Sequence, residues 1–260
     1  MSAHDEPVRI AMWSGPRTLS TATMRAWEHR ADTVVVDEPL YAYYLVRTGL
    51  DHPGRAEVLA GQPTDWREVV RELTQGPVPA AISYQKHMTH HVLPEVDLDA
   101  LAGLRHAFLV RDPRQLLASY ARVRESPTLA DLGLERQVAL YRRFGGPVVD
   151  AADLLRDPAT ALRGLCGALD VPFDPAMLSW PAGPRASDGV WAPHWYASVE
   201  ASTGFGASRE ERTALPDHGE LTPVVRVDGR QIGDGGTGPL TTRLSQAYAA
   251  LTASSGTLVV

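Results

Sequence analysis

Near the N-terminus, residues 8–21 read Val8-Arg9-Ile10-Ala11-Met12-Trp13-Ser14-Gly15-Pro16-Arg17-Thr18-Leu19-Ser20-Thr21. Its apolar first half predicts a buried strand, and the Ser-Gly-Pro that follows predicts a turn. The apolar spacing of residues 19–29 predicts a helix. A strand that leads through a short loop into a helix places backbone N–H groups, at the positive end of the helix dipole, where an anion can bind.

The loop itself carries residues that suit an anion. Arg17 adds a full positive charge, Thr18 and Leu19 lie where the chain enters the helix, and Ser20 and Thr21 add hydroxyl donors. The loop is not a Walker A loop, because the ending Gly-Lys-Ser/Thr is absent. Taken alone, it fits an ordinary strand-to-helix turn with a Ser or Thr cap equally well.

Three more short apolar runs predict strands, each followed by polar residues and a helical pattern. They cover residues 33–36, 79–84 and 106–110. This alternation predicts an α/β fold: a P-loop-like central parallel sheet with helices on both faces and a loop-rich C-terminal part. Ligands bind such sheets beyond the carboxyl ends of the strands. We assign residues 14–21, 37–39, 85–91 and 111–114 to that edge.

The last of these segments predicts a second anion subsite. Arg111 ends a strand, Pro113 stands in the first turn of the next helix, and Ser119 follows two turns in. An arginine can hold a phosphate through two N–H groups, with the serine as a second donor. Alone, the segment is as consistent with a capped helix start. Together with the first loop, it predicts two phosphate subsites on one sheet edge.

The composition excludes several classes of function. The chain has 260 residues, a net charge of −6 and one cysteine, Cys166. A general nucleic-acid binder needs a basic face, and a disulfide framework or multi-cysteine metal site needs more cysteines. Because no apolar run reaches the ~18 residues of a membrane span and residues 1–7 are polar, we expect a cytoplasmic protein. Lys86 is the only lysine among 25 basic residues.

Both anion segments resemble motifs of the sulfotransferase superfamily. Residues 16–21 are similar to the 5′-phosphosulfate loop, in the bacterial form Pro-Arg-Ser-Gly-Ser-Thr, and Arg111 with Ser119 resembles the 3′-phosphate motif, an arginine and a serine eight residues later. The similarity spans residues 8 to about 205. It implies 3′-phosphoadenosine 5′-phosphosulfate (PAPS) as donor, 3′-phosphoadenosine 5′-phosphate (PAP) as product, no metal, and a small-molecule hydroxyl acceptor.

The loop departs from the family pattern at three positions. Leu19 replaces the internal glycine, Arg17 stands where many eukaryotic members carry lysine, and Ala22 stands where those members place a tryptophan on adenine. Trp191 or Trp195 is a candidate substitute for that tryptophan, although a large aromatic side chain in a loop is more often packed. Both belong to residues 181–206, which predict an irregular loop or lid.

Arg185 lies in the same region and extends the resemblance. It stands in the segment Gly-Pro-Arg-Ala-Ser-Asp-Gly, residues 183–189, which is similar to the late glycine-rich phosphate segment of the family. The resemblance therefore implies a further contact to the donor from this side chain.

Sulfuryl transfer to an alcohol or phenol needs a base near the acceptor oxygen and positive charge near the sulfonate. The resemblance implies Glu38 as the base, because members with the Pro-Arg loop use a glutamate there. We interpret Asp37 as structural. A carboxylate that caps a helix beginning at Pro39 is the alternative interpretation.

The resemblance also implies a role for Lys86, since the Lys-x-His segment of cytosolic members supplies a lysine near the sulfonate. Residue 88 is a methionine, so the family histidine is not matched. His90 or His91 is then an alternative base, or a donor to the acceptor. Three histidines within residues 87–91 also suggest zinc, but no carboxylate is placed nearby, so metal binding is the minor alternative.

Residues 221–250 resemble the closing segment of class IV aminotransferases, a terminal hairpin and helix. We therefore divide the chain into a sulfotransferase-like domain, residues 1–215, and an appendage, residues 216–260. Aminotransferases hold pyridoxal phosphate on a lysine, and Lys86 stands far upstream in an unrelated context, which argues against that activity. We interpret the tail as a remnant of a fused architecture or as a homodimer contact.

Two other classes of function compete with the sulfotransferase interpretation. One is a P-loop kinase-like phosphotransferase, although the Gly-Lys-Ser loop and a clear Walker B aspartate for magnesium are missing. The other is a non-catalytic nucleotide-binding protein that has kept the donor pocket. If the protein is catalytic, Glu38 and Lys86 should face the same cavity as Arg17.

Overall fold

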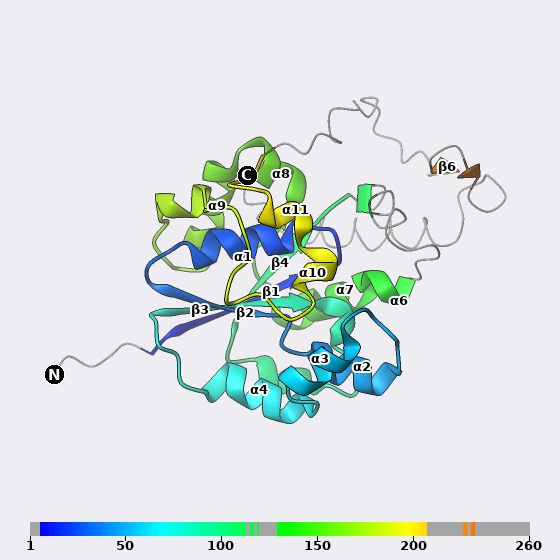
Figure 1. Cartoon of the computed structure of the whole chain (residues 1–260). Coiled ribbons are helices and arrows are strands. Elements are labelled where there is room, and N and C mark those ends of the chain that lie inside the picture. The colour runs from blue at the N-terminus through cyan, green and yellow to red at the C-terminus, as the bar shows by residue number, and fades with distance from the viewer. Residues whose placement is uncertain are drawn as a thin grey trace.

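Five parallel strands form the centre of the molecule (Figure 1). The computed structural model describes residues 6–112, 115–116, 119, 129–206, 226–227 and 230–231. The strands of the sheet are β1 (Val8–Ser14), β2 (Thr33–Asp37), β3 (Ile82–Met88), β4 (Arg105–Val110) and β5 (Val148–Asp150). They stand in the order β2-β3-β1-β4-β5, and each neighbouring pair is parallel.

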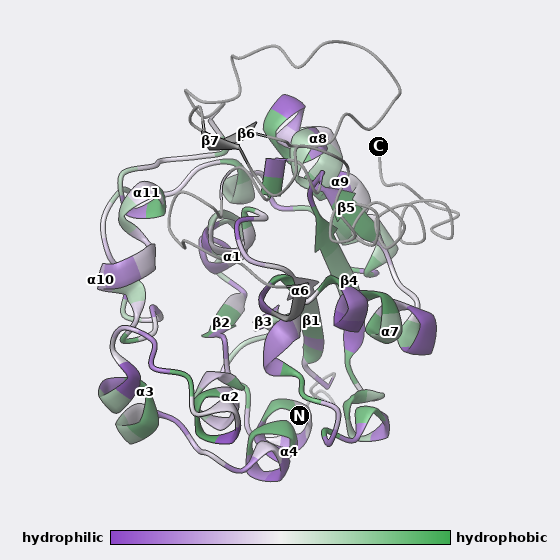
Figure 2. Ribbon diagram, turned by 90° about the vertical axis from the view of Figure 1, so that its right-hand side faces the viewer, coloured by the Kyte–Doolittle hydropathy of each residue, from purple (hydrophilic) through white to green (hydrophobic). Residues whose placement is uncertain are grey.

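Helices cover both faces of this sheet (Figure 2). The α-helices are α1 (Ser20–Glu28), α2 (Tyr41–Thr48), α3 (Arg55–Gly61), α4 (Trp66–Gln75), α6 (Leu129–Leu132), α7 (Leu134–Phe144), α8 (Ala151–Arg156), α9 (Pro158–Ala168), α10 (Ala192–Trp195) and α11 (Ala197–Glu200). Short 3-10 turns are η1 (Thr89–His91), η2 (Leu98–Leu101) and η3 (Pro175–Leu178). In Figure 1, α1, α8 and α9 lie above the sheet and α4 lies below it.

Alternate side chains of β1 enter two different cores. Ile10 and Met12 pack in one core, with residues of α1 and α9. Ala11 and Trp13 pack in the other, with residues of α4 and α7. Because both faces of the strand are buried, both of its side-chain rows must be apolar, as the unbroken apolar run of the sequence indicates. The predicted α/β fold with a covered parallel sheet is confirmed.

Strand β3 extends further than the sequence predicts. Its predicted end was Tyr84, but the strand continues to Met88, so Gln85 and Lys86 are strand residues and not loop residues. The expectation of a loop over residues 85–88 was therefore wrong. These polar side chains stay in the strand because they are buried against partners; Gln85 Nε2, for example, donates to the carbonyl of Leu73 at 3.0 Å.

The C-terminal part is described only in fragments. β6 (Arg226–Val227) and β7 (Arg230–Gln231) form an antiparallel pair. The predicted boundary at residue 215 and the rest of the proposed appendage, residues 216–260, lie outside the described residues. The predicted loop of residues 181–206 is described: it holds α10 and α11 between irregular stretches.

Candidate functional site

The loop between β1 and α1 lies at the carboxyl edge of the sheet. Arg17 and Leu19 have left-handed backbone, with φ of 60° and 65°. This conformation costs about 1–3 kcal/mol for a residue with a side chain and clusters at ligand sites. Leu19 precedes α1, and its hydrocarbon side chain cannot accept the hydrogen bond by which Ser or Asp caps a helix. The first N–H groups of α1 therefore have no cap from the residue that would normally supply one.

Close packing fixes the shape of this loop. A Cβ atom at Gly15 would lie 2.8 Å from the carbonyl oxygen of Leu132, so only glycine fits there. Thr18 is buried, and its Oγ1 donates to the carbonyl of Gly15 at 2.8 Å. Ser20 is also buried, while Thr21 is half-buried. The Thr18 hydroxyl thus holds the loop together, and the exposed cation of the loop is Arg17.

The two predicted phosphate segments meet in space. Arg17 Nε donates to Ser119 Oγ at 3.0 Å, across 102 residues of sequence. Arg111 donates through Nη1 to the carbonyl of Arg17 at 2.9 Å and through Nε to Gln115 Oε1 at 3.2 Å. Two guanidinium groups and a serine hydroxyl therefore gather beside the start of α1. This is a donor set suited to a ligand with two phosphate-like groups.

Lys86 lies at the same edge, on β3. Its side chain is 1% exposed, and Asp37, the last residue of β2, is its register partner. The Nζ atom donates to Asp37 Oδ1 at 2.9 Å, to Glu38 Oε1 at 2.6 Å and to Tyr196 Oη at 2.7 Å. An ammonium group has three N–H bonds, so these partners use all of them.

Asp37 connects the sheet to the C-terminal loop. Besides Lys86, its carboxylate accepts hydrogen bonds at Oδ2 from Tyr196 Oη at 2.7 Å and from the backbone N–H of Gly189 at 3.2 Å. Trp191 Nε1 in turn donates to Tyr196 Oη at 3.1 Å. One buried carboxylate therefore holds the loop of residues 181–206 over the ends of β2 and β3.

Glu38 follows directly in a backbone turn with φ of 42°. Its N–H donates to the carbonyl of Lys86 at 2.9 Å, and its carbonyl accepts from Gln62 Nε2 at 3.2 Å. These contacts hold a conformation that is costly for glutamate and turn its side chain toward Lys86. The Glu38 side chain is 12% exposed, in contrast to 2% for the Asp37 side chain. Of the two acids, Glu38 is the more accessible.

The charges of this cluster depend strongly on one another. Burial raises the pKa of Glu38 above its usual value, against the opposing effect of the Lys86 charge. Burial alone would lower the pKa of Lys86, but the charges of Asp37 and Glu38 outweigh it and raise that pKa well above its usual value. Burial likewise raises the pKa of Tyr196 well above its usual value. Lys86 is thus a cation and Tyr196 a neutral hydroxyl, beside a carboxylate that binds protons more readily than usual.

The two predicted histidines lie in an aromatic cluster next to this network. His91 is buried and stacks on Tyr41, with ring centroids 4.6 Å apart, and Tyr41 meets the edge of Trp191 at 5.2 Å. His90 meets the edge of Tyr44 at 5.3 Å. Burial, with the neighbouring His90, lowers the pKa of His91 well below its usual value. His91 is therefore a neutral, packed ring.

The tryptophan candidates for adenine stacking differ in exposure. Trp191 is 2% exposed and packed in the core, so the packing interpretation holds for it. Trp195 is 39% exposed. Arg185 lies beside the last turn of α1, where its Nε is 3.7 Å from Glu28 Oε2 and its guanidinium also donates to the carbonyl of Pro181. The structure does not bring Arg185 to Arg17 and Arg111.

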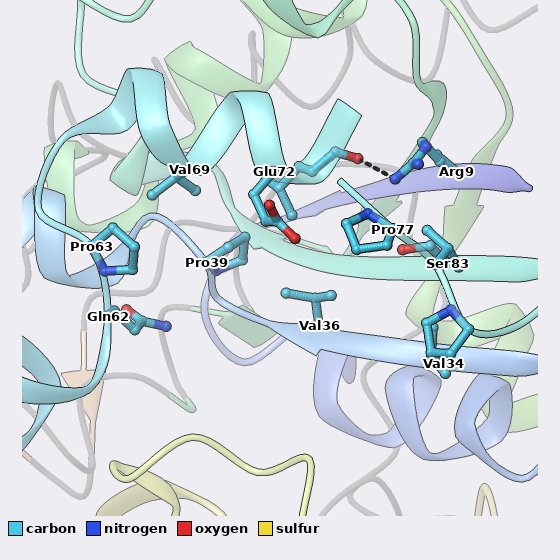
Figure 3. Close-up of a pocket in the computed structure, with 13 residues that line it drawn as sticks. Arg9, Val34, Val36, Pro39, Gln62, Pro63, Val69, Glu72, Pro77 and Ser83 are labelled. Atoms are coloured by element: carbon cyan, nitrogen blue, oxygen red, sulfur yellow. Dashed lines mark hydrogen bonds between the residues drawn. The ribbon is translucent and has the colours of Figure 1, made fainter. Parts of the chain in front are cut away.

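No three His, Cys, Asp or Glu side chains among the described residues are grouped so that they could hold a metal ion. A cavity of about 320 Å³ lies on the other face of the sheet, between β2 and α4 (Figure 3). Val34 and Val36 line it, and they point away from Asp37 because side chains alternate along a strand. Gln62, which also lines it, is the residue that holds the carbonyl of Glu38.

The structure brings together Arg17, Arg111 and Ser119 in one group and Lys86 and Glu38 in another. Tyr196 and Gln62 are not among the residues predicted from the sequence, and Asp37 was predicted to be structural. Asp37 could have been found, because it ends a strand beside the strand of the only lysine. Tyr196 and Gln62 reach the site through contacts over 110 and 24 residues of sequence, which no local pattern reports.

Known proteins resemble the chain in sequence. The sulfotransferase domain family matches residues 8–220. "Branched-chain-amino-acid aminotransferase-like protein 1" of Arabidopsis thaliana is 42% identical over 216 residues, which are 81% of this chain and 39% of that protein. "Branched-chain-amino-acid aminotransferase-like protein 2" of the same plant is 37% identical over 80% of this chain and 38% of its own length. The chain thus spans about two fifths of these curated relatives, whose names agree with the aminotransferase-like sequence of the tail.

Solved structures resemble the chain in fold. The "Sulfotransferase Domain from the Curacin Biosynthetic Pathway" superposes with a TM-score of 0.57 at 16% identity, over 95% of this chain and 98% of that one. The "Sulfotransferase Domain from the Synechococcus PCC 7002 Olefin Synthase" superposes with a TM-score of 0.52 at 18% identity, over 94% of each chain. In the described part of this chain, no helix is long and apolar enough to cross a membrane.

Proposed function

Because this chain belongs to the sulfotransferase domain family, we propose that it transfers a sulfuryl group from PAPS to a hydroxyl group of a small molecule. The observation that carries the proposal is the contact between the two anion segments, in which Arg17 reaches Ser119 and Arg111 reaches the backbone of Arg17. A ligand with phosphate groups at both ends of a ribose would engage both segments at once.

The residues present fit such a donor. Arg17, the backbone of Thr18 and Leu19, and the first turn of α1 with Ser20 and Thr21 would hold the 5′-phosphosulfate. Arg111 and Ser119 would hold the 3′-phosphate, and we leave Arg185 out of this subsite because Glu28 and Pro181 hold it elsewhere. The net charge of −6 does not oppose this, since a small group of arginines provides the local positive charge.

The donor supplies an activated sulfuryl group, bonded to a 5′-phosphate that can depart. Glu38 takes the proton from the acceptor hydroxyl, and that oxygen forms the new bond to sulfur as the bond to the 5′-phosphate oxygen breaks. Arg17 and the amides of α1 stabilise the negative charge that collects on the departing phosphate. The raised pKa of Glu38 suits a base, because a carboxylate of ordinary pKa holds a proton too weakly to help at neutral pH.

Lys86 provides positive charge beside the reacting centre. Its N–H groups all have protein partners, so its role in the form described here is to orient Glu38 and balance its charge. Direct donation to the sulfonate would require the exchange of one of these bonds. The same contacts oppose pyridoxal chemistry on this lysine, because a Schiff base needs a neutral amine.

The first test measures the melting temperature of the protein with PAP, ATP and pyridoxal phosphate. At 100 times its Kd, PAP should stabilise the fold by about 2.7 kcal/mol, which corresponds to a rise in Tm of roughly 5–10 °C. Arg17→Ala should lose most of this rise. The control Arg143→Ala, which removes an exposed surface pair with Asp99, should keep it.

Other outcomes of the melting-temperature test would contradict the proposed function. No rise in Tm with PAP at millimolar concentration would exclude the donor assignment. An equal or larger rise with ATP would favour a phosphotransferase, and a rise with pyridoxal phosphate would favour the chemistry that the names of the relatives suggest.

A further inference from the structure

Tyr196 lies between α10 and α11 and is 4% exposed. Its hydroxyl oxygen accepts from Lys86 Nζ at 2.7 Å and from Trp191 Nε1 at 3.1 Å, and its O–H donates to Asp37 Oδ2 at 2.7 Å. A hydroxyl group has one donor and two acceptor sites. All three are therefore in use, and each joins a different segment of the chain.

The geometry of Lys86 depends on this hydroxyl. Two of the three N–H groups of Lys86 point to Asp37 and Tyr196, and Asp37 is itself held by the Tyr196 O–H. With those two directions fixed, the tetrahedral ammonium group has only one direction left for its third N–H. That N–H meets Glu38 Oε1 at 2.6 Å. The position of the Glu38 carboxylate thus follows from contacts that it does not itself make.

The loss of the Tyr196 hydroxyl would disturb the hydrogen bonds of Lys86. Without the Tyr196 oxygen, Lys86 would keep a buried N–H with no partner, which is costly because that group has also lost its contact with water. The ammonium group would then turn to find a substitute, and water would enter beside Asp37. Either change would loosen the bond to Glu38, although neither would touch Arg17, Ser119 or Arg111.

We propose that Tyr196 is a positioning residue for the base: together with Asp37, its hydroxyl fixes Lys86 so that Lys86 orients the carboxylate of Glu38 toward the acceptor. The inference rests on the proposed role of Glu38 in sulfuryl transfer. It also gives a function to the loop of residues 181–206, which completes the catalytic cluster and does not merely cover it.

The test compares Tyr196→Phe with a matched control, Tyr84→Phe. Tyr84 is a fully buried tyrosine on the same strand as Lys86, and its hydroxyl has no hydrogen-bond partner among the described residues. Tyr196→Phe should lower kcat about 10- to 100-fold, with the KM for PAPS changed less than about twofold. Tyr84→Phe should keep the kcat of the wild type.

The pH profile separates positioning from a loss of general stability. The Lys86 charge lowers the pKa of Glu38 against the effect of burial, and in Tyr196→Phe the bond that brings this charge to Glu38 is loosened. The base works when deprotonated, so in Tyr196→Phe the acidic limb of kcat should move to higher pH. If kcat of Tyr196→Phe falls while the acidic limb of its pH profile stays at the wild-type pH, Tyr196 is only structural and the proposal is wrong. The same conclusion follows if kcat falls equally in Tyr84→Phe. Wild-type kcat in Tyr196→Phe would also overturn it.

A second measurement does not depend on activity. Because Lys86 is the only lysine, labelling with [15N]lysine gives a single ammonium signal. Its protons should exchange slowly with water in the wild type and in Tyr84→Phe, and at least about tenfold faster in Tyr196→Phe. If the wild type has no transferase activity or PAP binding, the proposed function fails, and equal exchange in all three proteins would independently overturn the positioning claim. If Tyr196→Phe does not fold, the test uses Trp191→Phe, which removes the donor to Tyr196 Oη. In that variant the Lys86 ammonium protons must exchange with water faster than in the wild type.

Discussion

Lys86, Asp37, Glu38 and Tyr196 form one buried hydrogen-bonded cluster. Lys86, the single lysine of an arginine-rich chain, is buried against Asp37 and Glu38. Removing one partner of a buried ion pair lowers the free energy of unfolding by several kcal/mol. Lys86→Ala would therefore leave two buried carboxylates without a cation and lower stability as well as turnover. A clean test at this scale has to change a group without leaving an unpaired charge.

Glu38→Gln is such a change, because the amide keeps an oxygen for the Lys86 N–H and loses only the basic group. We expect kcat to fall by about 10²- to 10⁴-fold, with PAP binding unchanged. The control is a titration of the variant with PAP, which shows that the donor site is intact. Retained turnover would pass the role of base to His90 or His91.

The pH dependence of the wild type follows from the same residue. A base must be deprotonated, so the rate should rise with pH through the pKa of Glu38, which burial raises above its usual value. Measured kcat should therefore have an acidic limb above the usual range for glutamate, and Glu38→Gln should lack it. A rate already constant down to the ordinary pKa of a carboxylate would contradict the assignment.

Among the elements, strand β1, helix α1 and the loop between them supply most of the residues of the proposed donor site. The Arg17 and Leu19 backbones are strained, and packing against α6 holds the loop in place through Gly15. This backbone strain lies in the loop that we propose binds the 5′-phosphosulfate, and strained backbone is frequent at ligand-binding sites.

Gly15→Ala tests this packing. Its new Cβ atom would meet the carbonyl of Leu132 at 2.8 Å, so the free energy of unfolding should fall by about 1–3 kcal/mol in urea denaturation. Gly103→Ala, where the Cβ atom would meet nothing within 4 Å, is the control and should change it little. Equal stability of the two variants would show that the loop is not held as described.

The sequence predicts these elements unevenly, for physical reasons. Apolar runs and turns reveal β1, β2 and β4, because burial of both faces leaves a local pattern. The end of β3 escapes prediction, since Lys86 and Gln85 are polar and are stabilised there by distant partners. Arg111 and Ser119 could be selected from sequence because they resemble a family motif, and both contact Arg17 in the structure. The contribution of Tyr196 could not, because it depends on how the loop of residues 181–206 folds back on the sheet.

At the scale of the whole molecule, the fold gathers two functions at one edge of the sheet. The ends of β1 and β4 carry the group with Arg17 and Arg111, and the ends of β2 and β3 carry the group with Glu38 and Lys86. β1 and β3 are neighbours, so the donor group and the base group stand side by side. The curated relatives are more than twice as long as this chain.

The assignment of the 3′-phosphate to Arg111 and Ser119 is tested by calorimetry, which compares the binding of PAP and adenosine 5′-phosphate. The two ligands differ only in the 3′-phosphate, which we assign to Arg111 and Ser119. The wild type should bind PAP about 10- to 100-fold more tightly. Arg111→Ala should remove this preference, and Arg17→Ala should weaken both ligands but keep it. Equal affinity of the wild type for both ligands, or a preference that survives in Arg111→Ala, would contradict the account.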